Sequence, residues 1–508
     1  MGANHLNWTR FEILGPQIVL LLTAVALAMT VNVHPVRHRS AAVMICFSGL
    51  VVATLAHLWN YSILSAGGAG TVSLPSWLVF DSMGWILSLS ILLIATAAMM
   101  LRRLRYYSGR DDGRLCLLFT LSVCGWSLLP MAADFSASAC CMLLATIPLL
   151  AWSAYGWEPG PLERLANRTL AGCLAMMLLA LLVLRHTTIA HAVVVARHGV
   201  NFSWHGLLIV LFLLPMIYWV GVVPLVWWFG DATRKQPLDL AFVLPLVPFV
   251  GSMAELLRVL RGLYLTDPAA ADVVVRVLTG LGIAAVVAYG IKALRQSDLA
   301  GIAGNMIGIL AATTLVAVSA AGPFHFGLVA KLVGCLAMYA LTAGLAAGLA
   351  LGIAGGEKPW TLEQLPEFAR TKVLSTLVLI LALLSLAGLP PTMGFIDRME
   401  LFRVIGYGSV METGGILALD VLSIALAGVA ALRVAAYACA PMAEPAVNVT
   451  EAVKKPRRAR RMELVPLALL LLASVVNGAA LCAYNPIQNV ASSFTSMHHS
   501  PVYRKADP

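Results

Sequence analysis

The chain has 508 residues, of which 60% are hydrophobic and only 11% are charged, and its formal net charge is +10. Soluble globular domains have about 45–50% apolar and about 25% charged residues. So few charged side chains cannot cover the surface of a soluble protein of this length. The composition therefore excludes an ordinary soluble enzyme and indicates that hydrocarbon surrounds most of the chain.

Long apolar runs alternate with short breaks that contain Arg, Pro or Gly. Each run has about 20–28 residues, enough for a helix to cross a hydrocarbon core ~30 Å thick. These runs predict an all-α integral membrane protein with about fourteen transmembrane helices. The predicted spans are 13–33, 41–64, 77–101, 114–132, 135–155, 168–187, 205–229, 238–264, 272–294, 301–321, 326–354, 371–407, 412–442 and 462–487.

The loops that follow odd-numbered spans carry most of the Lys and Arg, as at 102–114 and 454–461. Lys and Arg accumulate in cytoplasmic loops. Both termini are therefore predicted on the periplasmic face of a bacterial inner membrane. The basic run at 454–461 lies between two spans, which favours attraction to anionic headgroups of the lipid bilayer over a nucleic-acid partner.

Ionisable residues inside the predicted spans are few. Each costs about 2.5–3.5 kcal/mol on insertion, so each is a candidate functional residue. Asp81 opens the third span. Glu255 and Arg258 lie one turn apart in the eighth, where they can pair with each other or mark the end of the span. Lys331 lies near the start of the eleventh, where its ammonium group can extend to the interface.

The long run at 371–407 contains two consecutive prolines, Pro390 and Pro391. They remove two backbone donors and clash with the preceding turn, so we predict a helix break at 389–392. Carbonyls freed at membrane depth need polar partners. Four charged residues of alternating sign follow the break: Asp397, Arg398, Glu400 and Arg403. A hydrated polar pocket beside the break is the favoured interpretation, and purely structural charges are the alternative.

The sequence shows no glycine-rich phosphate loop, zinc-ligand spacing, haem motif or nucleophile elbow. His186, His191 and His198 fall in the predicted loop before the seventh span, where a solvated loop is favoured over a metal site or a pH sensor. We therefore predict no catalytic residue, no metal site and no cofactor bound by this chain.

The stretch from Leu386 to Arg398 reads Leu-Ala-Gly-Leu-Pro-Pro-Thr-Met-Gly-Phe-Ile-Asp-Arg. It resembles the broken-helix signature of the antiporter-like membrane subunits of respiratory complex I, and most closely that of subunit N of NADH:quinone oxidoreductase. Three further stretches occur in the order of that family: Phe80-Asp81, Val223-Pro224 through to Arg258, and Ala293 through to Leu299. The resemblance covers nearly the whole chain.

The resemblance implies two inverted five-helix repeats, each with one broken helix, a design also found in transporters. It divides the chain into helices 1–3 (residues 1–112), repeats at 113–265 and 266–445, and a basic loop, last helix and tail at 446–508. It implies other membrane subunits of a respiratory or antiporter complex as partners, with quinone and NADH used by the assembled complex.

In this family, buried Lys and Glu residues form a hydrated proton path. The candidates for such a path here are Arg398, Lys331, Asp397, Glu400 and Glu255.

This chain departs from the family pattern at the titratable positions. The key Glu of the fifth span falls on Leu143, and the Lys positions of the seventh and eighth spans fall on Trp219 and Phe249. Only the cation of the twelfth span remains, as Arg398, and a guanidinium stays charged at all accessible pH. We therefore expect a dry, packed core in the first repeat and a degenerate proton path.

Three functions remain open. The overall resemblance favours a membrane-arm subunit of a complex I-type NADH:quinone oxidoreductase, which couples quinone reduction to proton translocation. Related subunits also occur in multisubunit cation/proton antiporters and in ion-coupled carbon uptake systems. The missing Glu and Lys favour a non-pumping structural subunit.

Overall fold

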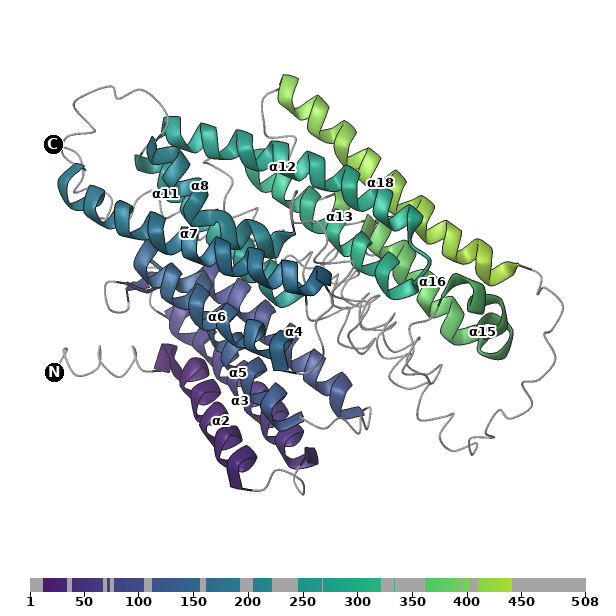
Figure 1. Cartoon of the computed structure of the whole chain (residues 1–508), viewed down its shortest axis with the longest axis horizontal. Helices are drawn as coiled ribbons and strands as arrows, with labels where there is room; N and C mark the ends of the chain where they lie inside the picture. The colour runs from purple at the N-terminus through teal and green to yellow at the C-terminus, as the bar shows by residue number, and fades with distance from the viewer. Residues whose placement is uncertain are drawn as a thin grey trace.

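A computed structural model of the chain describes residues 12–33, 39–66, 71–73, 77–104, 112–155, 161–191, 204–221, 245–266, 268–320, 333, 361–390, 392, 394–395, 397–399, 401 and 410–440. Nearly all of these residues are helical (Figure 1). The predicted proton-path candidates Lys331 and Glu400, and the predicted break residue Pro391, lie outside the described residues.

Three helices open the described chain: α2 (Gly15–Val33), α3 (Arg39–Ala66) and α4 (Ser82–Leu104). Between the last two, β1 (Thr71–Ser73) pairs antiparallel with β2 (Val79–Asp81). The all-α prediction is therefore wrong at this short hairpin, and the helix of the third span begins at Ser82. The β-branched Thr and Val residues of the hairpin favour extended backbone.

Five helices and one 3-10 turn follow: α5 (Asp112–Leu128), η1 (Leu129–Met131), α6 (Phe135–Tyr155), α7 (Pro161–His191), α8 (Trp204–Val220) and α11 (Leu246–Thr266). The helix α7 is longer than predicted. His186 and His191, expected in a loop, lie in its last turns.

The rest of the described chain is again helical: α12 (Pro268–Arg295), α13 (Leu299–Ala320), η2 (Leu362–Gln364), α15 (Leu365–Thr371), α16 (Val373–Ala387) and α18 (Val410–Cys439). In Figure 1, α2 to α6 gather on one side of the molecule, and α12, α13, α16 and α18 on the other, with α7, α8 and α11 between them.

Six of the described helices are long and apolar enough to cross a membrane: Ala41–Ser62, Ser82–Met100, Gly113–Met131, Ala271–Arg295, Leu299–Ser319 and Leu417–Cys439. Five shorter apolar helices accompany them. The outer faces of the bundle stay apolar, as at Leu22 and Trp59, which are 64% and 72% exposed. Such faces belong in lipid, so the chain is a multi-pass membrane protein. The full set of about fourteen spans stays a prediction.

Hydroxyl side chains inside these helices bond to their own backbone. Thr54, Thr120 and Thr146 each donate at 2.7 Å to the carbonyl oxygen four residues earlier. A polar group in hydrocarbon needs such a partner, because water is absent there. These threonines are therefore satisfied within their helices.

Aspartates begin two of the helices. Asp81 Oδ1 accepts the N–H of Gly84 at 2.7 Å at the start of α4, and Asp134 Oδ1 accepts the N–H of Ala137 at 2.6 Å at the start of α6. A carboxylate in this position satisfies a backbone donor that the helix itself leaves unpaired. Both aspartates are thus placed by the local sequence, and both lie next to the polar sites described below.

The helix break predicted at 389–392 occurs one residue earlier than expected. The last residue of α16 is Ala387, and Gly388 follows with φ of +77°. The N–H of Gly388 bonds to Ser385 O, and that of Leu389 bonds to Leu384 O. Glycine terminates a helix in this left-handed conformation at low cost, so Gly388 ends the helix before the prolines are reached.

Candidate functional site

The segment after the break brings Arg398 back against the end of α16. A Cβ added at Gly388 would lie 2.6 Å from Arg398 Cγ. Only glycine leaves room for the arginine stem here, and only glycine adopts this φ freely. The same residue therefore ends the helix and admits the cation.

Arg398 forms an ion pair in the interior of the protein. Its Nη1 lies 2.5 Å from Asp420 Oδ1 on α18, and the two residues are 1% and 2% exposed. The same Nη1 donates to Thr313 Oγ1 on α13 at 2.9 Å. One polar centre therefore joins the broken segment to two neighbouring helices.

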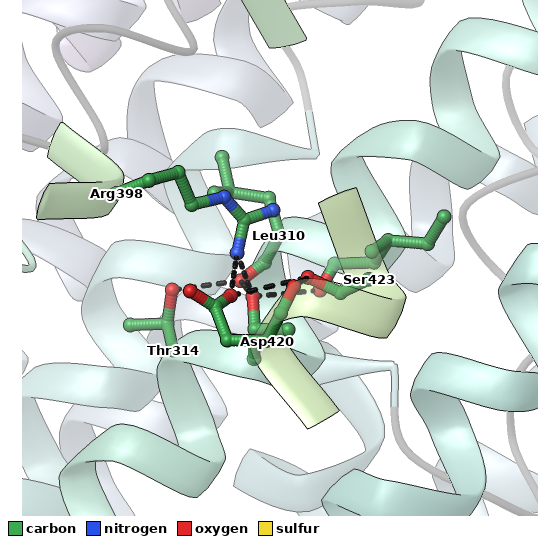
Figure 2. A network of polar contacts seen from close by, with 7 residues as sticks. Leu310, Thr314, Arg398, Asp420 and Ser423 are labelled. Atoms are coloured by element: carbon green, nitrogen blue, oxygen red, sulfur yellow. Dashed lines mark hydrogen bonds and ion pairs between the residues drawn. The ribbon is translucent and has the colours of Figure 1, made fainter. Parts of the chain in front are cut away.

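Figure 2 shows the guanidinium of Arg398 pointing at the carboxylate of Asp420, with Ser423 on one side and Thr314 on the other. Ser423 Oγ lies 3.1 Å from Asp420 Oδ1 and donates to Asp420 O at 2.7 Å. Thr314 donates to Leu310 O at 2.7 Å, within its own helix. The carboxylate thus lies against a cation from the segment after the break and a hydroxyl of its own helix.

This pair keeps two opposite charges buried side by side. Burying one such charge without a partner costs roughly several kcal/mol. The attraction within an ion pair offsets that cost only when the geometry is good and further hydrogen bonds are made. Arg398 Nη2 and Asp420 Oδ2 are buried and have no hydrogen-bond partner among the described residues. Because the guanidinium does not deprotonate, the pair holds a fixed charge and is unsuited to pass a proton.

Asp397, which directly precedes Arg398 and is also a predicted proton-path candidate, is buried too, at 3% exposure. Pro390 lies exposed at the break. The structure thus brings Arg398 and Asp397 into the interior beside the break.

Glu255 lies in a second polar site, away from Arg398. It is 2% exposed, on α11, and its Oε1 lies 2.5 Å from Ser138 Oγ on α6. The expected pairing of Glu255 with Arg258 is wrong. Arg258 Nη2 instead lies 2.9 Å from Asp81 Oδ1 and also donates to Pro130 O. The hydrogen bond from Gly84 already holds the carboxylate of Asp81 at the start of α4. Arg258 therefore meets a counter-ion whose position is fixed.

The three positions at which the resemblance places the family's Glu and Lys residues lie in or against the apolar core. Trp219 and Phe249 are 3% and 1% exposed, and Leu143 is half-buried. The ring of Trp219 meets that of Trp126 edge-on, with centroids 5.7 Å apart. Large apolar side chains therefore occupy these three positions.

Two residues of the Arg398 site were not predicted as proton-path candidates. Asp420 carries the signal of an ionisable residue inside a predicted span, as Arg433 does in the same span, but nothing in the sequence names Arg398 as its partner. Thr313 carries no such signal, because a threonine in an apolar helix most often bonds to its own backbone, as Thr313 also does to Ile309 O.

A scan against protein-family models finds no match. Curated relatives do exist. NADH-quinone oxidoreductase subunit N 1 of Streptomyces griseus is 27% identical over 406 residues, covering 78% of this chain and 82% of the relative. Subunit N of Laribacter hongkongensis is 25% identical over 404 residues, covering 76% and 80%. These relatives, all named subunit N, are consistent with a divergent antiporter-like membrane subunit.

Solved structures share the fold of this chain at low identity. A chain of respiratory complex I from Thermus thermophilus superposes with a TM-score of 0.67 at 20% identity, covering 92% of this chain and 99% of that one. A chain of an archaeal membrane-bound sulfane sulfur reductase gives 0.75 at 16% identity, covering 96% and 97%. A chain of the Mrp complex from Dietzia sp. DQ12-45-1b gives 0.69 at 14% identity, covering 95% and 99%. All three are parts of multisubunit membrane complexes.

Proposed function

We propose that this antiporter-like subunit belongs to the membrane arm of a complex I-type NADH:quinone oxidoreductase, where it accompanies quinone reduction coupled to proton translocation. The observation that carries the proposal is Arg398. It stands at the cation position of the family's broken helix and is bound there to Asp420 and Thr313. NADH and quinone are used elsewhere in such a complex, and other membrane subunits are this chain's neighbours in the bilayer.

Two inverted repeats, at 113–265 and 266–445, form part of the proposal. Two helices of the chain end in the same way, α8 at Gly221 and α16 at Gly388, and both glycines have φ of +77°. The helix α8 is the fourth helix of the first proposed repeat. When the span expected at 326–354 is counted, α16 is the fourth helix of the second proposed repeat. One matched helix end in each half supports the pairing.

A second correspondence supports the repeats. Arg258 on α11 donates to the carbonyl of Pro130, between α5 and α6. Arg433 on α18 donates to the carbonyl of Leu294, at the end of α12, and to that of Gln296, between α12 and α13. In each proposed repeat, an arginine of the fifth helix therefore donates a hydrogen bond to the connection between the first and second helices.

The chain's own proton path is proposed to be degenerate in the part served by Arg398. The guanidinium stays charged, and its carboxylate partner is held by it. Of the proposed path residues, Glu255 has no ion-pair partner among the described residues, while Asp397, Lys331 and Glu400 remain candidates for the second repeat. Location in a bacterial inner membrane with both termini periplasmic belongs to the same proposal.

A second candidate is a subunit of a multisubunit cation/proton antiporter or an ion-coupled carbon uptake system. The shared fold with a chain of the Mrp complex favours keeping it. A non-pumping structural subunit is the third, favoured by the apolar side chains at Leu143, Trp219 and Phe249.

The test is purification of the tagged chain from its native membrane in mild detergent, with mass spectrometry of the proteins that accompany it. The proposal predicts NADH-oxidising and quinone-reducing subunits. Antiporter or carbon-uptake subunits in their place would contradict it and establish the second candidate.

A further inference from the structure

Glu255 differs from Asp420 in what holds it. Its Oε1 contacts Ser138 Oγ, and its Oε2 is buried without a hydrogen-bond partner among the described residues. Arg258, three residues further along the same helix, is bound to Asp81. A buried carboxylate with no paired cation is costly when ionised, so a carboxyl group in this position can hold a proton.

Ser138 has two acceptors within reach and one proton to donate. Its Oγ lies 2.5 Å from Glu255 Oε1 and 2.9 Å from Asp134 O. A hydroxyl group donates one hydrogen bond and accepts up to two. Both contacts are direct hydrogen bonds when Glu255 is protonated, since the acid then donates to Ser138 Oγ and Ser138 donates to Asp134 O.

The ionised form is also accommodated. The Ser138 O–H then turns to the carboxylate, and Asp134 O keeps the backbone N–H of Ser138, which lies at 3.0 Å. Rotation of one hydroxyl therefore satisfies Glu255 in either protonation state without moving a helix.

Ser252 lies one turn before Glu255 on α11, and Trp126 packs against the same helix. Trp126 Nε1 and Ser252 Oγ have no hydrogen-bond partner among the described residues. The ring of Trp126 packs on α11 at Gly251, where an added Cβ would lie 2.4 Å from Trp126 Cε3. Gly251 and Ser252 are four and three residues before Glu255, so all three share one face of the helix.

A buried water molecule makes about three hydrogen bonds. The indole N–H of Trp126, the hydroxyl of Ser252 and a carboxyl oxygen of Glu255 are the donors and acceptors that such a water needs. Such a water can take the proton of Glu255. The O–H bond of the acid breaks, its electron pair stays on the carboxylate, and the proton passes to the water oxygen.

We infer that the first repeat contains a proton-binding site centred on Glu255, with Ser138 stabilising both of its forms and Ser252 and Trp126 holding the exchanging water. A metal cation fits less well, because Trp126 offers only a donor. The charged and titratable groups around the site are Arg258 on the same helix, Asp81, Asp134, and Cys141 one turn beyond Ser138 on α6. The role of this site in proton movement rests on the proposed function, while its existence does not.

The test is a pH-induced infrared difference spectrum of the purified full-length chain in lipid nanodiscs. We expect a band from a protonated carboxyl group that disappears at alkaline pH and is lost in Glu255→Gln. Ser138→Ala should shift this band without abolishing it, as should Ser252→Ala and Trp126→Phe.

The matched controls are Ser48→Ala and Trp59→Phe, at exposed positions of α3. They should leave the band in place. An unchanged band in Glu255→Gln would overturn the site, and an unshifted band in both Ser252→Ala and Trp126→Phe would overturn the water. Because the measurement uses the isolated chain, it can fail while the complex I proposal stands, or succeed while that proposal fails.

Discussion

Two buried carboxyl groups in this protein are held by opposite means. Asp420 faces the guanidinium of Arg398 at 2.5 Å, so its negative charge is balanced permanently. Glu255 faces the hydroxyl of Ser138 at 2.5 Å, and its charge has no such balance. The first arrangement joins the segment after the break to α13 and α18, and the second is suited to gain and lose a proton. Burial alone therefore does not determine whether a carboxyl group in a membrane helix carries a fixed charge or exchanges a proton. The group that it is paired with determines this.

The largest expected effect comes from breaking the ion pair. Asp420→Asn leaves the charge of Arg398 buried without a counter-ion, which costs about 3–5 kcal/mol when one partner of a buried pair is removed. We expect loss of most folded protein, measured as the monodisperse fraction in detergent size-exclusion chromatography. The double variant Arg398→Met with Asp420→Leu removes both charges and should recover folding. Equal losses in the single and double variants would show that the charge is not the cause.

A smaller effect is expected at the ion pair between Arg258 and Asp81, in which Arg258 is partly exposed. Asp81→Asn keeps the capping oxygen for α4 and removes only the charge that Arg258 meets. A hydrogen bond between charged groups contributes about 1.5–3 kcal/mol, and Arg258 retains some access to solvent, so the loss should fall at or below the low end. Thermal unfolding of the purified chain measures it, with Glu367→Gln at an exposed position of α15 as the control. A loss as large as that of Asp420→Asn would contradict the distinction between the two pairs.

The glycine that admits Arg398 gives a third test. Gly388→Ala forces a Cβ into the left-handed conformation, at about 1–2 kcal/mol, and against the arginine stem. Gly280→Ala in α12 is the matched control, since nothing lies within 4 Å of an added Cβ there. Alanine is the better helix former by about 1 kcal/mol, so the control should be neutral or stabilising in the same thermal unfolding assay. A neutral Gly388→Ala would show that the break does not require this residue.

The smallest expected effect on stability is that of Glu255→Gln. The amide keeps an oxygen for Ser138 and carries no charge, as the protonated acid does. We expect a change within about 0.5 kcal/mol in thermal unfolding. A loss comparable to that of Asp420→Asn would mean that Glu255 is held as a fixed charge, against the comparison made above.

Most of the fold follows from the sequence, because apolar length and the positions of Pro390 and Gly388 are strong local signals. The candidate site follows only in part. Arg398 is marked by its place after the break, but its partner Asp420 is distant in sequence, and local spacing instead favoured pairing Glu255 with Arg258. That pairing fails because Asp81 is placed by a hairpin that hydropathy does not reveal. That the indole N–H of Trp126 has no partner among the described residues also depends on packing between helices, which the sequence does not reveal.

Proton pumping by native membrane vesicles, driven by the electron donor of the assembled complex, tests the central claim most directly. The comparison is between the wild-type chain and Glu255→Gln at matched amounts of assembled complex. The account predicts that Glu255→Gln assembles normally and moves fewer protons for each electron transferred. Unchanged pumping in that variant would contradict the claim that the carboxyl group without a cation partner is the one that exchanges protons.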